Sequence, residues 1–349
     1  MLAGKNIILD RTTIQEALVR LNEVAMSSAV LFIIDWEDKL VGTLTDGDVR
    51  RGLLSRCNVD DQVSLIMNKS FTFLRKDDYE PKAINQIRAR EIRFVPVLDA
   101  QSRIDRILDL DNFSALLPLD VIVMAGGKGE RLLPLTKDTP KPLLPIGGKP
   151  IVEYNMDRLI KSGVSRITLS VRYQAQKIMS YFGDGGKKNI QIEYLAETSP
   201  LGTFGSVSLL KNLKHETLLV LNSDLLTTIN FEDFYQSFMD SGADMAVATT
   251  PYHIDVPYAV FELDNGQKIT SLVEKPRYTY YSNAGMYLLK KDCLSIMNTG
   301  EFMNATDFIE AMIQKNKKVI SYPILGYWLD IGLMEDYQKA QEDIKHLKF

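Results

Sequence analysis

The first third of the chain repeats one pattern of apolar and polar residues. In each copy an apolar strand ends in an aspartate and is followed by a short turn and a second strand. These strand pairs are predicted at Ala29–Asp35 with Leu40–Leu44, and at Phe94–Asp99 with Arg103–Leu110. Equivalent residues, such as Asp35 and Asp99, lie 64 positions apart. A period this long indicates two paired subdomains rather than a solenoid.

A helix is predicted ahead of the strands in each copy. In the first copy, Thr13 and Glu16 have the spacing of a capping box, and Ile14 and Leu21 follow on one helical face. In the second copy the helix is predicted at Pro81–Arg90. We therefore expect a small α+β pair over residues 1–118, with subdomains at 1–60 and 64–118.

From Val121 onward, strands and helices alternate. The predicted elements are a strand at Val121–Ala125, a helix at Ile151–Lys161, and strands at Arg166–Val171, Gln191–Leu195, Leu218–Asn222 and Met245–Thr249. This alternation predicts an α/β domain over residues 119–349, with a mixed, mainly parallel sheet and helices on both faces. Ligands of such sheets bind beyond the carboxyl ends of the strands.

Composition and charge exclude several classes of function. A chain of 349 residues suits two domains, and 45% apolar with 25% charged residues is typical of soluble proteins. The net charge of −4 gives no general attraction to nucleic acid or anionic membranes. The N-terminus lacks the apolar core of a signal peptide, and no apolar run approaches the ~18 residues of a membrane span. We expect a cytoplasmic protein that binds neither nucleic acid nor membrane.

Cysteine and histidine are too scattered to form a metal cluster. The residues are Cys57, Cys293, His215, His253 and His346. Any metal ion must therefore be held by carboxylates.

A glycine-rich loop directly follows the predicted strand Val121–Ala125. It carries three glycines, Gly126, Gly127 and Gly129, and among its cations are Arg131 and Lys141. Because glycine lacks a Cβ atom, the N–H groups of this loop can surround phosphate oxygens, and the two cations add positive charge. The loop is not a Walker A loop, because no Lys-Ser/Thr pair follows the last glycine. It is not a dinucleotide fingerprint either, since Leu132 stands where a third glycine would.

The loop resembles that of sugar-phosphate nucleotidyltransferases, a family with a Rossmann-like, glycosyltransferase-A-type fold. The resemblance covers Val121 to about Ala340, and four more motifs follow in the family's order. They are Pro200-Leu-Gly-Thr203, Leu221-Asn-Ser-Asp224, Val273-Glu-Lys-Pro276 with Ser282-Asn-Ala-Gly285, and Trp328-Leu-Asp-Ile-Gly332. Two positions depart from the family's pattern: Ser223 and Ala259 stand where glycine is common, which bears on the choice of substrate.

The resemblance implies a role for each matched residue. Catalytic roles fall to Arg131, Lys141, Asp224 and Asp330, of which the two aspartates are implied to bind Mg2+. Nucleotide binding is implied for Ala125, Gly126, Gly127, Gly129, Glu197, Gly202 and Thr203. The sugar phosphate is implied to contact Glu274, Lys275, Asn283 and Gly285.

The implied reaction joins a nucleoside triphosphate to a sugar 1-phosphate, with Mg2+ as cofactor, and releases pyrophosphate. A phosphate monoester has a second pKa of about 6, so it is largely dianionic at pH 7 and attacks the α-phosphate without a general base. Catalysis then consists of positioning and charge neutralisation. The sugar stays open among glucosamine, mannose and heptose 1-phosphate.

Glu197 predicts the base of the donor. In uridylyl- and thymidylyltransferases of the family a Gln is common at this position. Its amide both donates and accepts, so it can pair with one N–H and one carbonyl of uracil or thymine. Guanine presents two adjacent donors, which suit a carboxylate. We therefore expect GTP as the donor, with UTP as the alternative, and the competing interpretation that Glu197 is a solvated loop residue.

The segment Val41–Arg51 resembles the end of a CBS motif, the cystathionine-β-synthase-type repeat. The resemblance implies that Thr45 and Asp48 hold the ribose of a regulatory nucleotide, and many such pairs dimerise, so we expect a homo-oligomer. The competing interpretation is a turn whose side chains cap the following helix. Two other classes of function stay open: a silent paralogue that senses nucleotide sugars, and an energy sensor acting through the N-terminal pair.

Overall fold

The computed structural model describes residues 6–24, 29–76, 83–111 and 116–347. Contacts divide the chain into two compact units. The first comprises Met1–Leu116 with Lys161–Gly163, and the second comprises Leu117–Ile160 with Val164–Phe349. Among the described residues, no helix is long and apolar enough to cross a lipid bilayer.

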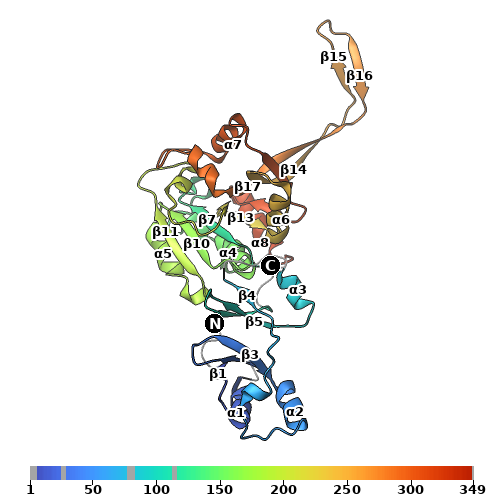
Figure 1. Cartoon of the computed structure of the whole chain (residues 1–349). Helices are drawn as coiled ribbons and strands as arrows, with labels where there is room; N and C mark the ends of the chain where they lie inside the picture. The colour runs from blue at the N-terminus through green and yellow to red at the C-terminus, as the bar shows by residue number, and fades with distance from the viewer. Residues whose placement is uncertain (1–5, 25–28, 77–82, 112–115, 348–349) are drawn as a thin grey trace. The chain divides into compact units, whose positions relative to one another are not determined.

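The first unit contains two three-stranded sheets, β1-β2-β3 and β4-β5-β6 (Figure 1). The first has β1 (Ile7–Leu9), α1 (Ile14–Val24), β2 (Val30–Ile34), β3 (Leu40–Thr45) and α2 (Asp46–Leu54). The second has β4 (Leu74–Arg75), α3 (Ala83–Arg88), β5 (Phe94–Leu98) and β6 (Ile104–Asp109). The predicted strands and helices are present, whereas β1 and β4 were not predicted. Residues 81 and 82 of the helix predicted at Pro81–Arg90 lie outside the described residues.

The internal repeat extends to the strand register. Leu31 pairs with Leu44 in the first sheet, and Val95 pairs with Leu108 in the second. Each residue of the second pair lies 64 positions after its equivalent in the first pair. A short 3-10 helix, η1 (Val63–Leu65), packs in the core of the first half, and Ile66 and Met67 pack against that core. The first half therefore continues to Met67.

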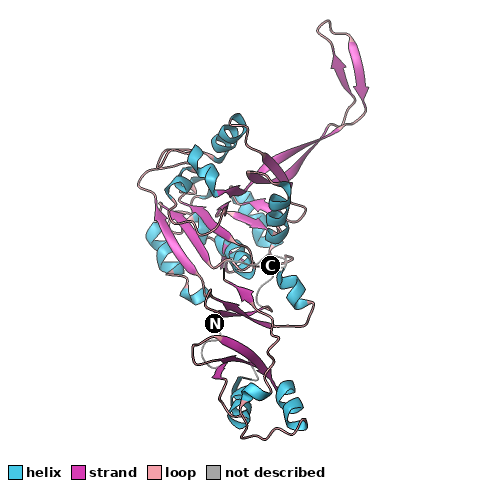
Figure 2. Cartoon of the chain, viewed as in Figure 1, coloured by secondary structure: helices cyan, strands magenta, loops and turns pink. Residues whose placement is uncertain are grey.

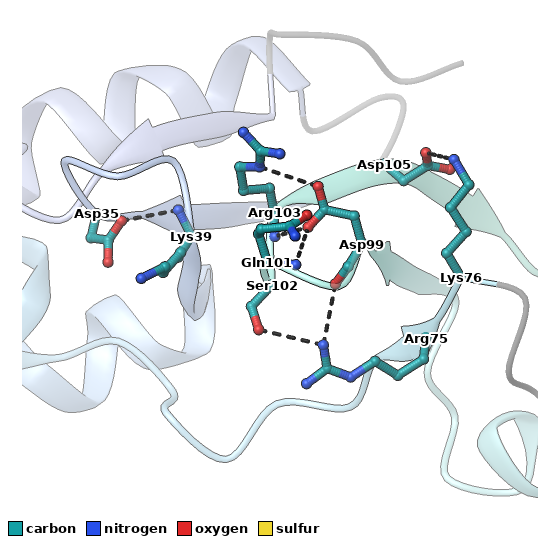
Figure 3. A network of polar contacts seen from close by, with 9 residues as sticks. All are labelled: Asp35, Lys39, Arg75, Lys76, Asp99, Gln101, Ser102, Arg103 and Asp105. Atoms are coloured by element: carbon teal, nitrogen blue, oxygen red, sulfur yellow. Dashed lines mark hydrogen bonds and ion pairs between the residues drawn. The ribbon is translucent and has the colours of Figure 1, made fainter.

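The same repeat is visible in the turns that follow β2 and β5. Asp35 Oδ1 accepts the Lys39 N–H at 2.9 Å, and Asp99 Oδ1 accepts the Arg103 N–H at 2.8 Å (Figure 3). The two sheets meet at these turns, where the Leu40 N–H donates to the Ser102 carbonyl at 3.0 Å. Apolar residues of both sheets form one cluster beneath them: Phe32, Leu40, Phe94, Leu98 and Ile107.

The second unit is built on a seven-stranded sheet in the order β11-β10-β7-β12-β17-β14-β18, and helices flank it (Figure 2). Its strands are β7 (Leu119–Ala125), β10 (Arg166–Val171), β11 (Gln191–Ala196), β12 (Thr217–Asn222), β14 (Met245–Asp255), β17 (Arg277–Lys290) and β18 (Val319–Pro323). Only β17 runs against its neighbours. The fold is thus the mixed, mainly parallel α/β fold that the alternation predicted.

Helices and small strands complete the second unit. The helices are α4 (Ile151–Lys161), α5 (Ala175–Phe182), α6 (Phe231–Ser241), α7 (Ala305–Gln314) and α8 (Met334–Asp343). The small strands are β8 (Pro145–Ile146), β9 (Lys149–Pro150), β13 (Leu225–Thr227), β15 (Val260–Leu263), β16 (Ile269–Val273) and β19 (Trp328–Asp330). Five further 3-10 turns are η2 (Glu130–Leu132), η3 (Lys141–Leu143), η4 (Gly186–Lys188), η5 (Gly205–Leu209) and η6 (Lys291–Ile296). Consecutive residues of β12 are buried, as expected for a strand covered on both faces.

One strand is longer than the sequence predicted. The strand predicted at Met245–Thr249 continues to Asp255, because its outer half pairs with β17 in a two-stranded ribbon. The ribbon and the β15–β16 hairpin at its end stand away from the sheet (Figure 1). We call residues Thr250–Ser282 the arm.

Candidate functional site

A pocket of about 530 Å3 opens beside the carboxyl ends of β7 and β12, where the strand-end rule places ligands. Its lining includes nine of the predicted site residues: Gly126, Gly127, Gly129, Arg131, Lys141, Glu197, Gly202, Thr203 and Asp224. Segments far apart in the sequence therefore meet here. Ala125, the last residue of β7, is buried and is not part of the lining.

Two aspartates, Asp224 in the pocket lining and Asp330 outside it, meet at one side of the pocket because two short strands pair there. β13 runs antiparallel to β19, with Leu225 opposite Asp330, and the Ile331 N–H donates to the Asp224 carbonyl at 3.0 Å. This ladder brings Asp224, which follows β12, beside Asp330 at the end of β19. Lys141 forms an ion pair with Asp224 Oδ2.

The shared environment raises the pKa of Asp330. Burial has the largest effect and the negative charge of Asp224 adds to it, so the pKa rises from 3.8 to about 6. The positive charges of Lys141 and Arg131 act in the opposite direction. Two acidic groups are therefore held together at an energetic cost, which is typical of a functional site.

The two carboxylates fit a magnesium ion. Asp224 Oδ1 and Asp330 Oδ1 are both buried and lack a hydrogen-bond partner within the described part of the chain. A buried unsatisfied oxygen is costly, and a hard cation would satisfy both. The described residues hold no group of three or more His, Cys, Asp or Glu side chains that could bind a metal. Mg2+ fits this set because it commonly uses one or two carboxylates and completes its shell with water and phosphate.

Glu197 lies in the pocket beneath the glycine loop. Its side chain is only 5% exposed, so the solvated-loop interpretation is wrong. Glu197 Oε1 accepts a hydrogen bond from Ser170 Oγ at 2.6 Å, and Oε2 lies 3.8 Å from Arg172 Nε. A Cβ atom at Gly126 would lie 2.8 Å from Glu197 Oε1, so only glycine allows this approach.

The second loop of the pocket is fixed to the segment before α7. Gly202 has φ +77°, and a Cβ there would lie 2.6 Å from the Met303 carbonyl oxygen. Thr203 Oγ1 accepts the Ala305 N–H at 3.0 Å and so caps the first turn of α7. Thr203 lines the pocket, but its hydroxyl has this structural role.

The predicted sugar-phosphate residues do not gather at the pocket. Glu274 and Lys275 are exposed on the arm and do not belong to the pocket lining, all residues of the arm being described. Asn283, at the base of the arm, donates from Nδ2 to the Tyr287 hydroxyl at 2.8 Å and accepts the Gly285 N–H at 2.9 Å. Ala259 also lies on the arm, away from the lining, whereas Ser223 lines the pocket.

Thr45 and Asp48 form a capping box at the start of α2. Asp48 Oδ2 accepts both the Thr45 N–H at 2.8 Å and the Thr45 hydroxyl at 2.7 Å. The helix begins at Asp46, so the capping interpretation accounts for both side chains. Ribose binding stays a prediction.

Sequence reasoning missed Arg172 and Asn222. Arg172 directly follows β10, Asn222 is the last residue of β12, and both line the pocket. The strand-end rule, applied to every strand rather than to recognised motifs, would have found them.

A profile of the family described as Nucleotidyl transferase matches residues 120–346. This chain belongs to the nucleotidyl transferase family. The match covers the second unit and leaves the N-terminal pair outside it.

Individual relatives agree with this assignment. The "Bifunctional protein GlmU" of Methanococcus maripaludis is 36% identical over 226 residues, which cover 61% of this chain and 51% of that protein. The D-glycero-alpha-D-manno-heptose 1-phosphate guanylyltransferase of Aneurinibacillus thermoaerophilus is 28% identical over 231 residues, which cover 65% and 99% of the two chains. The chain thus spans about half the length of the first curated relatives it matches.

A solved structure shares the fold. The crystal structure of HddC from Yersinia pseudotuberculosis complexed with GMP-PN aligns with a TM-score of 0.51 and 29% identity. The alignment covers 64% of this chain and 99% of HddC. That protein therefore has the same central architecture and was crystallised in complex with GMP-PN.

Proposed function

We propose that this chain is a guanylyltransferase that joins GTP to a sugar 1-phosphate and releases pyrophosphate. The observation that carries the proposal is the buried carboxylate of Glu197 in the pocket beside Arg172. Membership of the nucleotidyl transferase family supports the reaction class. Relatives named as guanylyltransferases of mannose 1-phosphate and heptose 1-phosphate support the donor.

Glu197 and Arg172 together present the complement of guanine. Guanine offers two adjacent donors on its pairing edge, N1–H and the exocyclic amine, and acceptors at O6 and N7. Glu197 would accept from the two donors. Arg172 Nε is buried and has no hydrogen-bond partner within the described residues, so it is suited to donate to the acceptor edge. Uracil lacks the second adjacent donor that a carboxylate needs.

In the proposed reaction, an oxygen of the sugar phosphate forms a bond to the α-phosphorus, and the bond from that phosphorus to the pyrophosphate oxygen breaks. The N–H groups of the glycine loop, with Arg131 and Lys141, would hold the triphosphate and neutralise the charge of the leaving pyrophosphate. Mg2+, bound by Asp224 and Asp330, would supply further neutralisation of the phosphates. Glucosamine, mannose and heptose 1-phosphate are the proposed acceptors.

The donor is tested by comparing kcat/KM for GTP and UTP with a panel of sugar 1-phosphates, using pyrophosphate release as the readout. We expect GTP to be preferred by roughly 10- to 100-fold, the discrimination of a bidentate contact. Glu197→Gln should lower this ratio, whereas Glu130→Gln, an exposed glutamate at the same pocket, should leave it unchanged. Preference of the native enzyme for UTP would contradict the proposal, and an unchanged ratio in Glu197→Gln would contradict its physical basis.

A further inference from the structure

The pocket lining contains one aromatic side chain among the residues that the structure describes. Phe302 lies in the segment before α7, lines the pocket and is 61% exposed. Single exposed apolar side chains are ordinary on protein surfaces. Phe302 differs in its place, because the rest of the lining consists mostly of glycines, prolines and polar or charged residues. Its ring is therefore an apolar surface that a bound molecule can cover.

Backbone contacts fix the chain on both sides of Phe302. The Met303 N–H donates to the Leu201 carbonyl at 3.0 Å, and the Met303 carbonyl accepts the Gly205 N–H at 3.0 Å. On the other side, a Cβ atom at Gly205 would lie 2.5 Å from the Glu301 carbonyl oxygen, so these two backbones are in close contact. Phe302 thus stands between two anchored residues, which reduces the ordering that a ligand must impose on it.

The side chains of this segment divide between the core and the pocket. Met303 packs against the hydrophobic core of the second unit, whereas its neighbour Phe302 lines the pocket. The Asn304 N–H then donates to Asp307 Oδ2 at 2.9 Å, at the start of α7. Turning Phe302 into the core would expel Met303 from it. The segment therefore presents Phe302 to the pocket.

The triphosphate is a poor partner for Phe302. The face of an aromatic ring carries negative potential, and the ring has no N–H or O–H donor for a phosphate oxygen. The proposed phosphate ligands of the pocket are instead the cations Arg131 and Lys141 and the N–H groups of the glycine loop. A planar, largely apolar face is the surface that matches a phenyl ring, and a nucleotide base offers one.

The loop that anchors Phe302 favours the base. Leu201, which accepts the hydrogen bond from Met303, lies four residues after Glu197 and lines the same pocket. In the proposed function, Glu197 and Arg172 contact only the edge of the base. Hydrogen bonds along one edge leave a planar ring free to tilt about that edge, whereas a second ring stacked on its face restricts the tilt.

We propose that Phe302 stacks on the face of the donor base while Glu197 and Arg172 contact its edge. This assignment rests on the proposed function, since that function places a nucleoside triphosphate in the pocket. Every base has a π-face, so stacking strengthens binding without choosing strongly among bases. Phe302 then supplies affinity and Glu197 supplies specificity. Loss of an aromatic stacking partner weakens the binding of a base about 5- to 150-fold.

Calorimetry on the full chain, with Mg2+ and without sugar phosphate, separates the base from the phosphates. The two probes are GTP and inorganic tripolyphosphate, which has neither base nor ribose. Phe302→Ala should raise the Kd for GTP roughly 5- to 150-fold and leave the Kd for tripolyphosphate unchanged. Native affinity for tripolyphosphate also shows that the variant pocket is folded. Phe302→Tyr, which keeps a stacking ring, should retain the native Kd for GTP.

Leu325→Ala is the matched control for the loss of an exposed apolar side chain. Leu325 is 96% exposed and is not part of the pocket lining, so its removal should change neither Kd. Native affinity for GTP in Phe302→Ala would overturn the proposal. Equal losses of affinity for GTP and tripolyphosphate would also overturn it, because Phe302 would then support the phosphate end of the pocket or the fold.

Fluorescence tests the contact itself. Phe302→Trp places an indole where the phenyl ring lies, and the native chain, with Trp36 and Trp328, gives the background emission. A guanine stacked on an indole quenches its emission, so GTP should quench the variant more than the native chain, and tripolyphosphate should not. Equal quenching of both proteins by GTP would overturn the stacking.

Steady-state kinetics separate the base from the sugar. In Phe302→Ala the KM for GTP should rise, while the KM for sugar 1-phosphate should keep its native value. A rise confined to sugar 1-phosphate would overturn the proposal, because the ring would then pack on the acceptor. If the native chain binds GTP but releases no pyrophosphate with any acceptor, the proposed function fails, and calorimetry and fluorescence still decide the stacking. If the native chain binds no nucleoside triphosphate, both proposals fail.

Discussion

The pocket and the arm arise from the same sheet but differ in what surrounds their residues. β7 and β12 end inside the second unit, so side chains beyond their ends are held by neighbouring segments. β14 and β17 instead leave the sheet, and in the described part of the chain their outer residues pair with each other rather than with further strands of the sheet. The comparison teaches that a strand end inside a fold positions a functional group by itself. The outer residues of a strand that leaves the fold are not positioned by neighbouring segments of the sheet in this way.

The largest effect on activity should come from the pocket's two carboxylates. Asp224→Asn and Asp330→Asn each remove a charge from the proposed magnesium site while preserving shape, so we expect pyrophosphate release to fall about 10²- to 10³-fold. Asp138→Asn, at an exposed aspartate, is the control and should keep native activity. Turnover in EDTA equal to that in Mg2+ would show that the pocket works without a metal ion.

The arm should affect only one substrate. Lys275→Ala removes the proposed contact to the sugar phosphate, so we expect the KM for sugar 1-phosphate to rise roughly 10- to 100-fold, as for loss of a charge-assisted contact. The KM for GTP should stay near its native value. Lys268→Ala, at the hairpin turn, is the matched control. A rise in the KM for GTP would mean that the arm contacts the nucleotide, and the comparison between pocket and arm would then lose its basis.

The sequence predicted the pocket better than the arm for a physical reason. Asp224 and Gly126 follow buried strands whose apolar pattern is unambiguous, and Glu197 follows the edge strand β11, so the strand-end rule places all three at one edge of the sheet. Asp330 required in addition the pairing of β13 with β19, which no local pattern indicates. The motif at Lys275 was recognised, but its position depends on the direction of a ribbon beyond the sheet, and alternation of side chains does not determine that direction.

The N-terminal unit shows how far a repeat alone can predict structure. The 64-residue spacing missed β1 and β4, the third strand of each sheet, but anticipated the pairs β2–β3 and β5–β6, because turns at Asp35 and Asp99 fix these strands in the same way. It did not anticipate that Val63 packs with the first half, since an irregular segment has no periodic signal.

A moderate effect on stability should follow from the raised pKa of Asp330. The pKa of Asp330 in the folded protein, about 6, lies above the ordinary value of 3.8, so the folded protein holds this proton more tightly than the unfolded chain does. The resulting stabilisation of the folded protein is fully present below pH 3.8 and is lost as the pH rises through about 6. At pH 7.5 in EDTA, Asp330→Asn should therefore raise the Tm, by on the order of 2–4 °C, and the gain should vanish near pH 4. Thermal unfolding at both pH values checks this. A lower Tm for the variant at pH 7.5 would show that Lys141 and Arg131 outweigh burial.

The smallest effect should come from the exposed ion pair on the arm. Asp255 and Arg277 lie 2.6 Å apart with side chains 64% and 63% exposed, so solvent screens their attraction. Asp255→Ala should change the Tm by less than about 1 °C. Asp120 provides the counterpart inside the second unit: it is 4% exposed, pairs with Arg166, and accepts the His215 N–H at 2.7 Å. Asp120→Ala should lower the Tm by more than about 5 °C, because it removes the nearer carboxylate from Arg166, whose side chain is only 12% exposed, and leaves the longer 3.5 Å contact to Glu193. Both are pairs of an aspartate with an arginine, so the difference in Tm reflects burial together with the hydrogen bond from His215. If Asp255→Ala instead destabilises as strongly as Asp120→Ala, the Asp255–Arg277 pair must be shielded from solvent, which would contradict its exposure in the structure.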